Sequence, residues 1–141
     1  MSGFLLDTNC ISEAVRVNPE PRVLAWIEAA DESLLYLSVL TLGEIRKGLA
    51  ALPPGRRRTK LETWVEVELR ARFSGRILSI DAEVADRWGL LAAGAKAQGK
   101  PLSVIDGLLA ATALHHNLTI VSRNVSDFAN VPVVVVNPWK V

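Results

Sequence analysis

The first apolar segment of the chain, Phe4-Leu5-Leu6, ends directly on Asp7-Thr8-Asn9. A strand without polar residues is buried on both faces, which is typical of a parallel sheet covered by helices. The carboxyl ends of the strands in such a sheet form the edge where ligands bind. This segment therefore restricts the chain to folds with helices on both faces of a sheet, and it places Asp7 at a candidate site.

Strand and helix signals alternate along the rest of the chain. Four further strands are predicted at 34–37, 76–80, 118–121 and 133–136. Helices are predicted from Thr8 to about Val15, from Pro19 to Ala30, from Ser38 to about Leu52, from about Arg57 to Phe73, from Asp81 to Gln98 and from Ser103 to Leu114. Thr8, Ser38 and Asp81 are the predicted caps of their helices, and Ser103 opens the last one. Strands joined by helices need right-handed crossovers, which predicts an α/β fold with a central parallel sheet of about five strands.

The composition narrows the setting. With 141 residues and 50% hydrophobic content, a single domain over residues 1–141 is expected. Cys10 is the only cysteine, so no intrachain disulfide can form and a cytoplasmic location is expected. We expect no signal peptide and no membrane span, because no basic residue precedes the first apolar run and no segment approaches roughly 20 apolar residues. The net charge of +1 gives no general attraction to nucleic acid.

Two more acidic residues stand in apolar surroundings. Glu44 lies in the second turn of the helix that begins near Ser38, and Asp106 lies near the start of the apolar helix that begins at Val104. Burial of several unpaired carboxylates near one another is costly unless positive charge joins them. A divalent cation would satisfy this need for Asp7, Glu44 and Asp106 together.

Each acid also has a purely structural interpretation. Asp7 suits a helix N-terminus, whose dipole favours a carboxylate. Glu44 follows Thr41 by three residues, and Asp106 follows Ser103 by three, which is the spacing of a capping box. The cap of the third helix is better placed directly after its strand, which leaves Glu44 beyond the first turn. Carboxylate oxygens select Mg²⁺ or Mn²⁺ over zinc.

Four segments carry a family resemblance: Leu5-Leu6-Asp7-Thr8-Asn9, Ser38-Val39-Leu40-Thr41-Leu42-Gly43-Glu44, Asp106-Gly107-Leu108-Leu109-Ala110-Ala111-Thr112-Ala113 and Val121-Ser122-Arg123-Asn124. In order and spacing they resemble a PIN-domain ribonuclease. More narrowly, the chain resembles the VapC toxins of bacterial toxin–antitoxin pairs, including the FitB-like branch, whose members often end in Asn-Pro-Trp. The resemblance implies a three-layer α/β/α sandwich, Mg²⁺- or Mn²⁺-dependent endoribonuclease activity, and catalytic positions at Asp7, Glu44 and Asp106.

The resemblance and the ligand types suggest a role for each residue. A bound metal can supply an activated water for phosphodiester hydrolysis. Asp7 and Asp106 are assigned as direct metal ligands, and Glu44 as a ligand or water-orienting group. Asn9 and Ser103 either hold carboxylates and waters in place or serve only as turn and cap residues.

One position departs from the family pattern. A fourth metal-site acid is expected where this chain has Asn124, so the site loses one negative charge. An asparagine can still offer a carbonyl oxygen or bind a metal's water. Asp127 would substitute if its loop turns inward, and otherwise it is a solvent-exposed capping residue.

Basic residues and apolar stripes suggest the partners. Arg56, Arg57, Arg58 and Lys60 either contact RNA phosphates or form a solvated charged turn. The resemblance implies a VapB-type antitoxin, a homodimer, a heterotetramer or larger assembly with the antitoxin, and DNA contact only through the antitoxin. We expect an apolar stripe on the third and fourth helices to leave some surface for another chain: Leu49, Leu52, Leu61, Trp64, Val65 and Leu69.

Two other classes remain possible at this point. A phosphoacceptor receiver domain also gathers carboxylates at a sheet edge, but it needs adjacent acids after the first strand and a lysine after the last, and neither is found here. A catalytically weak PIN domain that only binds an antitoxin or regulator is compatible with Asn124. A metal-dependent nuclease assay separates these alternatives.

Overall fold

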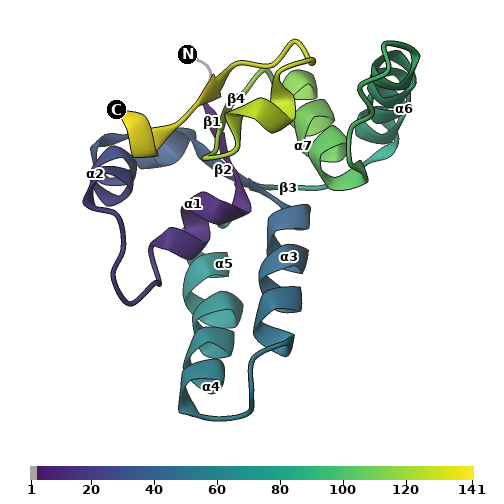
Figure 1. The fold of residues 1–141 in the computed structure, drawn as a ribbon. Coiled ribbons are helices and arrows are strands. Elements are labelled where there is room, and N and C mark those ends of the chain that lie inside the picture. Colours follow the sequence, from purple (N-terminus) through teal and green to yellow (C-terminus); the bar gives the residue numbers. More distant parts are fainter. Residues whose placement is uncertain (1–2) are drawn as a thin grey trace.

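The computed structural model describes residues 3–141 and contains one five-stranded sheet (Figure 1). The strands are β1 (Phe4–Leu6), β2 (Leu35–Ser38), β3 (Ile77–Leu78), β4 (Thr119–Val121) and β5 (Val135–Val136). Their order in the sheet is β3-β2-β1-β4-β5, and every pair is parallel. The predicted parallel sheet of about five strands is therefore confirmed, with β1 at its centre.

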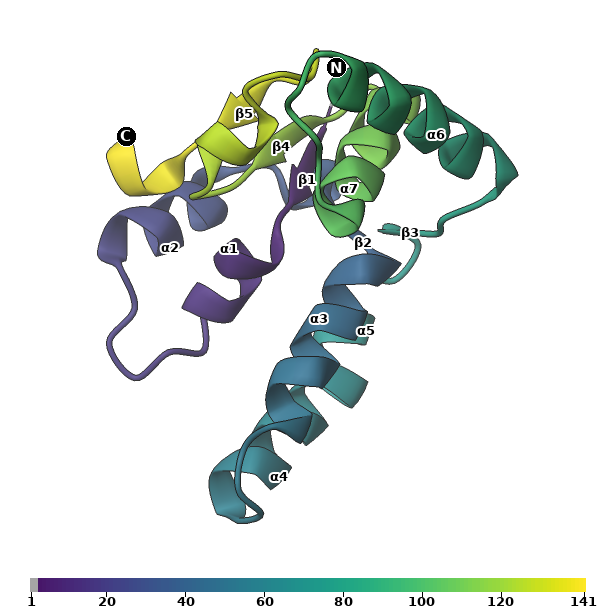
Figure 2. The same ribbon diagram turned by 45° about the vertical axis from the view of Figure 1, so that its right-hand side comes forward.

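Helices cover both faces of the sheet (Figures 1 and 2). The α-helices are α1 (Thr8–Glu13), α2 (Pro21–Ala29), α3 (Val39–Ala50), α4 (Arg56–Thr63), α5 (Arg70–Arg72), α6 (Ala82–Ala97) and α7 (Val104–His115). The other helical segments are η1 (Glu32–Leu34), η2 (Trp64–Leu69), η3 (Val125–Phe128) and η4 (Pro138–Lys140). No helix in residues 3–141 is long and apolar enough to cross a membrane.

Alternate residues of β1 divide the core into two clusters. Leu5 packs with Leu109 and Ile120 on the face that α7 covers, whereas Leu6 packs with Ile11 on the face that α1, α2 and α3 cover. Successive side chains of a strand point to opposite faces, so one short apolar run can serve both layers. This is the physical reason that β1 has no polar residue.

The predicted helix boundaries hold in part. Ser38, Asp81 and Ser103 cap their helices as expected, since each side chain accepts a backbone N–H hydrogen bond in the first turn. The assignment of Thr8 as the first cap was wrong, because the Asp7 carboxylate accepts the Thr8 N–H at 2.8 Å and caps α1 instead. Strand 76–80 is shorter than predicted and consists of β3 alone.

The predicted helix 57–73 forms a continuous helical run of changed pitch. It consists of α4, a π-helical segment η2 and the short α5. In a π-helix the backbone hydrogen bonds join residues five apart, and apolar spacings of three and four do not reveal this wider turn. The face that the run presents to the core therefore rotates relative to that of a regular α-helix.

The predicted apolar stripe lies on the hairpin formed by α3 and the helical run α4–η2, and its residues pack in or against the core. Leu49, Val65 and Leu69 are buried in the core, and Leu52, Leu61 and Trp64 are partly buried against it. The expectation that part of this stripe binds another chain stays a prediction, because Leu52, Leu61 and Trp64 are only partly buried. α3 contacts both α4 and α1, and the hairpin formed by α3 and α4 thereby removes part of the stripe from solvent.

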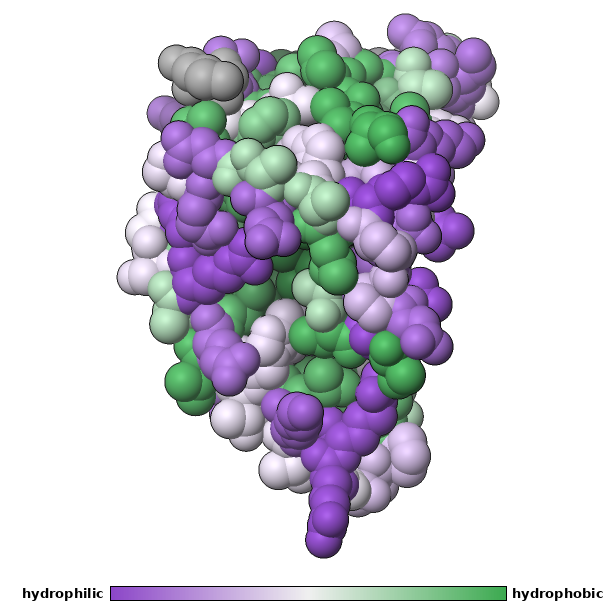
Figure 3. Space-filling model, turned by 90° about the vertical axis from the view of Figure 1, so that its left-hand side faces the viewer, coloured by the Kyte–Doolittle hydropathy of each residue, from purple (hydrophilic) through white to green (hydrophobic). Residues whose placement is uncertain are grey.

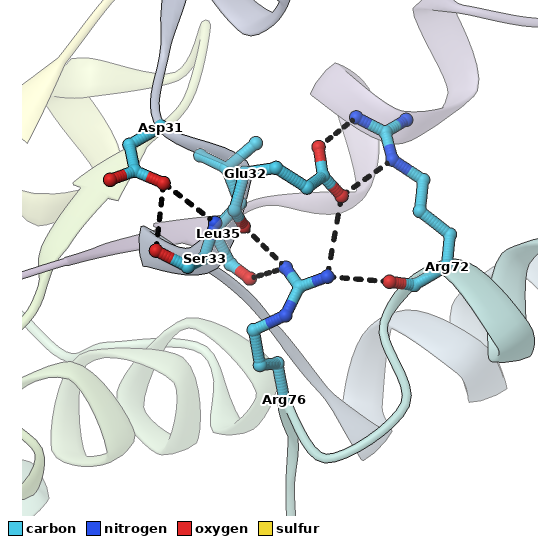
Figure 4. Close-up of polar contacts among 6 residues, drawn as sticks. All are labelled: Asp31, Glu32, Ser33, Leu35, Arg72 and Arg76. Carbon is cyan, nitrogen blue, oxygen red and sulfur yellow. Dashed lines mark hydrogen bonds and ion pairs between the residues drawn. The ribbon is translucent and has the colours of Figure 1, made fainter.

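Two arginines fasten the β2–β3 edge of the sheet (Figure 4). The Arg76 guanidinium donates to the backbone carbonyls of Glu32, Leu35 and Arg72. Arg72 donates two hydrogen bonds, at 3.0 and 2.9 Å, to the Glu32 carboxylate, which also lies 3.3 Å from an Arg76 nitrogen. Hydrogen bonds from Arg72 are the main reason that the pKa of Glu32 lies below its ordinary value. This arginine cluster ties η1 to α5 and to the start of β3.

Candidate active site

The three candidate acids come from separate elements that meet at the carboxyl edge of the sheet. Asp7 follows β1, Glu44 lies in the second turn of α3, and Asp106 lies in the first turn of α7. The N-terminal ends of α1, α3 and α7 all lie near this edge (Figures 1 and 2). The carboxylates are close enough to act on one another, since the charges of Glu44 and Asp106 both raise the pKa of Asp7.

Asp7 is held in place by the end of β4, which pairs with β1. Its backbone N–H donates to the Val121 carbonyl at 2.9 Å, and its carboxylate accepts a 2.7 Å hydrogen bond from the Ser122 hydroxyl. The Asn9 amide lies 3.5 Å from the same carboxylate and 3.3 Å from Ser122. The structure thus gives Asn9 the positioning contact that was one of its two predicted roles.

Ser122 is the residue that sequence reasoning missed. Its hydroxyl donates to Asp7 and accepts the Asn124 backbone N–H at 3.0 Å, so it joins the ends of β1 and β4. It is fully buried. The signal was present, because Ser122 directly follows an apolar strand in the same way that Asp7 follows β1.

Glu44 is oriented by the first residue of α1. The Thr8 hydroxyl donates to the Glu44 carboxylate at 2.6 Å and lies 3.3 Å from the Thr41 hydroxyl. Thr8 was predicted only as a helix cap, and the contact joins residues 36 positions apart. No periodicity in the sequence connects them.

Asp106 combines a structural contact with an electrostatic one. Its backbone N–H donates to the Ser103 hydroxyl at 3.2 Å, so the cap interpretation holds for its backbone. Burial is the main cause that raises the pKa of the Asp106 carboxyl, the charges of Asp127 and Glu44 raise it further, and a hydrogen bond with Ser103 opposes them. Asp127 is an exposed residue of η3, near enough to contribute this charge effect.

Asn124 lies at the rim of the site. It precedes η3, its side chain is exposed, and it makes no capping hydrogen bond there. Its backbone is fixed through Ser122, which leaves the amide group free of a structural duty in that helix.

The site has the electrostatics of a cation site without a basic partner. Burial is the main cause that raises the pKa of Asp7, and hydrogen bonds from Ser122 and Thr8 oppose it. Among the ion pairs of residues 3–141, none involves Asp7, Glu44 or Asp106. Repelling carboxylates that lack arginine or lysine partners favour a bound cation.

The candidate ligand atoms are carboxylate oxygens, the type of atom that a hard cation prefers. Within the described residues, no group of three or more histidine, cysteine, aspartate and glutamate side chains is arranged to hold a metal ion. Mg²⁺ does not require such a cage, because it keeps several waters and binds through few carboxylates. Asp7 and Asp106 offer oxygen atoms only, which suits Mg²⁺ or Mn²⁺.

The predicted RNA contacts lie apart from these acids. Arg56, Arg57, Arg58 and Lys60 belong to α4, whose first turn is at the tip of the α3–α4 hairpin, away from the sheet (Figures 1 and 2). Arg58 donates to the Leu52 carbonyl at 3.1 Å, which is a structural duty. Arg57 and Lys60 line a cavity of about 650 Å³ between the hairpin and residues 14–16, which follow α1. Their contact with RNA stays a prediction.

Comparison with known proteins agrees with this geometry. The PIN domain family matches residues 4–134. VapC ribonuclease Y4jK of Sinorhizobium fredii is 40% identical over 137 residues, covering 97% of this chain and 98% of that protein. Toxin FitB of Neisseria gonorrhoeae is 40% identical over 136 residues, covering 96% and 98% respectively. The solved structure of FitAB bound to the IR36 DNA fragment matches with a TM-score of 0.91 and 39% identity, covering 96% of this chain and 95% of that one. The chain therefore belongs to the PIN domain family.

Proposed function

We propose that the chain is a metal-dependent endoribonuclease and the toxin of a type II toxin–antitoxin pair. The observation that carries the proposal is the meeting of Asp7, Glu44 and Asp106 at one sheet edge without a basic partner. Such an edge is the expected ligand site of a parallel sheet. The names of two relatives, a VapC ribonuclease and the toxin FitB, support the same activity.

Each residue has a defined task in this proposal. Asp7 and Asp106 would hold Mg²⁺ or Mn²⁺, and the bound ion would supply an activated water and neutralise charge on the phosphate. Glu44 would orient that water or bind the ion, with Thr8 fixing its carboxylate. Ser122 would keep the Asp7 carboxylate in one orientation through its 2.7 Å hydrogen bond.

The fourth acid is assigned to Asp127. Asn124 cannot supply a negative charge, whereas the charge of Asp127 acts on Asp106. Asn124 would then bind a water of the ion through its amide oxygen. The site keeps a negative charge on the η3 side, although the acid that supplies it is displaced by three residues.

We further propose that the chain is a cytoplasmic, homodimeric toxin whose partner is an antitoxin, with DNA contact through that antitoxin. The related FitB toxin and the FitAB complex with DNA support this assembly. A surface for the partner is available on the face that carries α2 and α4, where apolar side chains lie between hydrophilic ridges (Figure 3). Two adjoining cavities of about 640 and 650 Å³ lie there, and both are lined by Val15, Trp64 and Glu68.

The test is cleavage of single-stranded RNA by the purified chain. We expect cleavage with Mn²⁺ or Mg²⁺, none with EDTA, and none from the Asp106→Asn variant. Antitoxin binding without any cleavage at saturating Mn²⁺ would instead establish the binding-only alternative and overturn the nuclease proposal.

A further inference from the structure

A groove of about 570 Å³ runs along α3 from the candidate active site. Its lining consists of Val39, Leu40, Gly43, Glu44, Lys47, Gly48, Ala51 and Ile105. Glu44 belongs to both the groove and the acid cluster, so a strand that is cut at the acids can continue directly into the groove. We call this surface the α3 groove.

Lys47 is the only basic residue in the lining of the α3 groove. It is exposed and stands one turn after Glu44 on the same helix. In the described part of the chain it makes no hydrogen bond or ion pair, whereas the adjacent Arg46 pairs with Glu62 and Glu66. An unpaired ammonium group beside a cluster of acids is available for a ligand of negative charge.

The rest of the α3 groove is apolar and open. Val39 and Ile105 remain 37% and 38% exposed and form parts of its wall. A Cβ atom built on Gly43 or Gly48 would meet nothing within 4 Å, so the glycines leave free space along the helix. Apolar walls with one cation suit a nucleoside next to a phosphate, because phosphate contacts position a strand and apolar surfaces cover its bases.

We propose that the α3 groove binds the RNA strand next to the scissile phosphate, with Lys47 contacting a flanking phosphate and Val39 and Ile105 packing against the nucleoside. This inference rests on the proposed ribonuclease function. The occupant follows from charge complementarity and from continuity with the acids. The chain has a net charge of only +1, so attraction of an RNA phosphate beside the acids must come from a local cation such as Lys47. Lys47 is thus a positioning residue.

The decisive variants are Lys47→Gln and Lys47→Arg, with Lys96→Gln as the matched control. Lys96 is exposed and lies in the last turn of α6, just as Lys47 lies in the last turn of α3, so both lysines have the same relation to a helix dipole. Gly48→Glu is a second test, since it places a negative charge in the open groove without a steric clash.

RNA binding is measured by fluorescence anisotropy in EDTA, and cleavage kinetics are measured separately in Mn²⁺. We expect Lys47→Gln to raise Kd and KM by about tenfold, as for one lost charged contact. The slope of log Kd against log salt concentration should fall by about one, as for the loss of one phosphate contact. We expect kcat to change little. Lys47→Arg should retain affinity, Gly48→Glu should lose it, and Lys96→Gln should match the native chain.

The two levels of the proposal fail in different ways. If the native chain does not cleave RNA in Mn²⁺, the ribonuclease function is overturned, whatever the anisotropy shows. If it cleaves but Lys47→Gln and Gly48→Glu bind RNA like the native chain, the assignment of the α3 groove is wrong. If these variants instead change the oligomeric state in sedimentation experiments, a second copy of the chain occupies the groove and RNA does not.

Discussion

Two clusters of charged side chains in this molecule are built in opposite ways. At the β2–β3 edge, Glu32 lies between Arg72 and Arg76, and hydrogen bonds from Arg72 lower its pKa. At the carboxyl edge, Asp7 and Asp106 face other carboxylates, and burial together with those charges raises their pKa values. The first cluster is complete within the chain, whereas the second needs a charge from outside.

The contrast separates stability from function. Paired charges whose hydrogen bonds are satisfied support the fold, and removal of one partner is costly. Repelling carboxylates are costly as they stand and are retained where a ligand compensates them, which is why perturbed pKa values gather at functional sites. Variants in the two clusters should therefore affect different measurements.

The largest effect is expected for Asp106→Asn. Loss of a metal ligand should lower cleavage on the order of 1000-fold, because several kcal/mol of transition-state stabilisation are removed. The metal-free protein should be at least as stable as the native chain, since the substitution relieves repulsion. Cleavage assays and urea unfolding in EDTA measure the two effects. Asp86→Asn, on the exposed side of α6, should leave both unchanged, and a clear loss of stability in Asp106→Asn would make Asp106 a structural cap.

The reverse pattern is expected for Arg76→Ala. Three backbone carbonyls and the Glu32 carboxylate lose a donor, which should destabilise the fold by about 2 kcal/mol. Cleavage per folded molecule should stay the same, because the arginine cluster is separate from the acids. Arg70→Ala is the control, with a change within about 0.5 kcal/mol for an exposed residue. A drop in cleavage at full folding would show that the two clusters are coupled.

A smaller effect is expected for Asn124→Asp. One more negative charge near the ion should lower the Kd for Mn²⁺ by about three- to tenfold. Titration calorimetry on both proteins, with Asp127→Asn as the opposite variant, measures the change. Asp127→Asn should bind Mn²⁺ more weakly, because Asp127 is assigned as the fourth acid, and unchanged affinities in both variants would show that neither residue lies near the ion.

The smallest effect is the pH dependence of stability without metal. The raised pKa of Asp106 adds stability below its ordinary value of 3.8, and this contribution is lost as pH rises through the folded-state pKa. The lowered pKa of Glu32 acts in reverse: its contribution is full above its ordinary value of 4.5 and is lost as pH falls through the folded-state pKa. The gain from Asp106→Asn and the loss from Glu32→Gln should therefore both be largest near neutral pH and shrink toward acid. Urea unfolding across this range tests both, and a gain for Asp106→Asn that grows on acidification would contradict the assignment.

Sequence patterns predicted the parallel sheet and three of its helix caps because these depend on local signals. The apolar run before Asp7 predicts a buried strand, and Ser38 before α3 predicts a helix cap, each from a few neighbouring residues. The contacts of Thr8 with Glu44 and of Ser122 with Asp7 join residues 36 and 115 positions apart, and no local rule predicts them. The π-helical segment η2 was also missed, because apolar spacings of three and four do not reveal its wider turn.

The pairing of β1 with β4 has a consequence for the order of folding. The backbone of Asp7 is bonded to Val121, and its carboxylate to Ser122, so the site cannot be complete until the chain has been synthesised past these residues. Contacts of such high sequence separation form late, because the long loop between them must close first. A nascent chain that has reached only α7 already contains Asp7, Glu44 and Asp106, but it lacks the strand that fixes the first of them. Assembly of the acidic edge is therefore delayed until the chain has left the ribosome beyond Ser122.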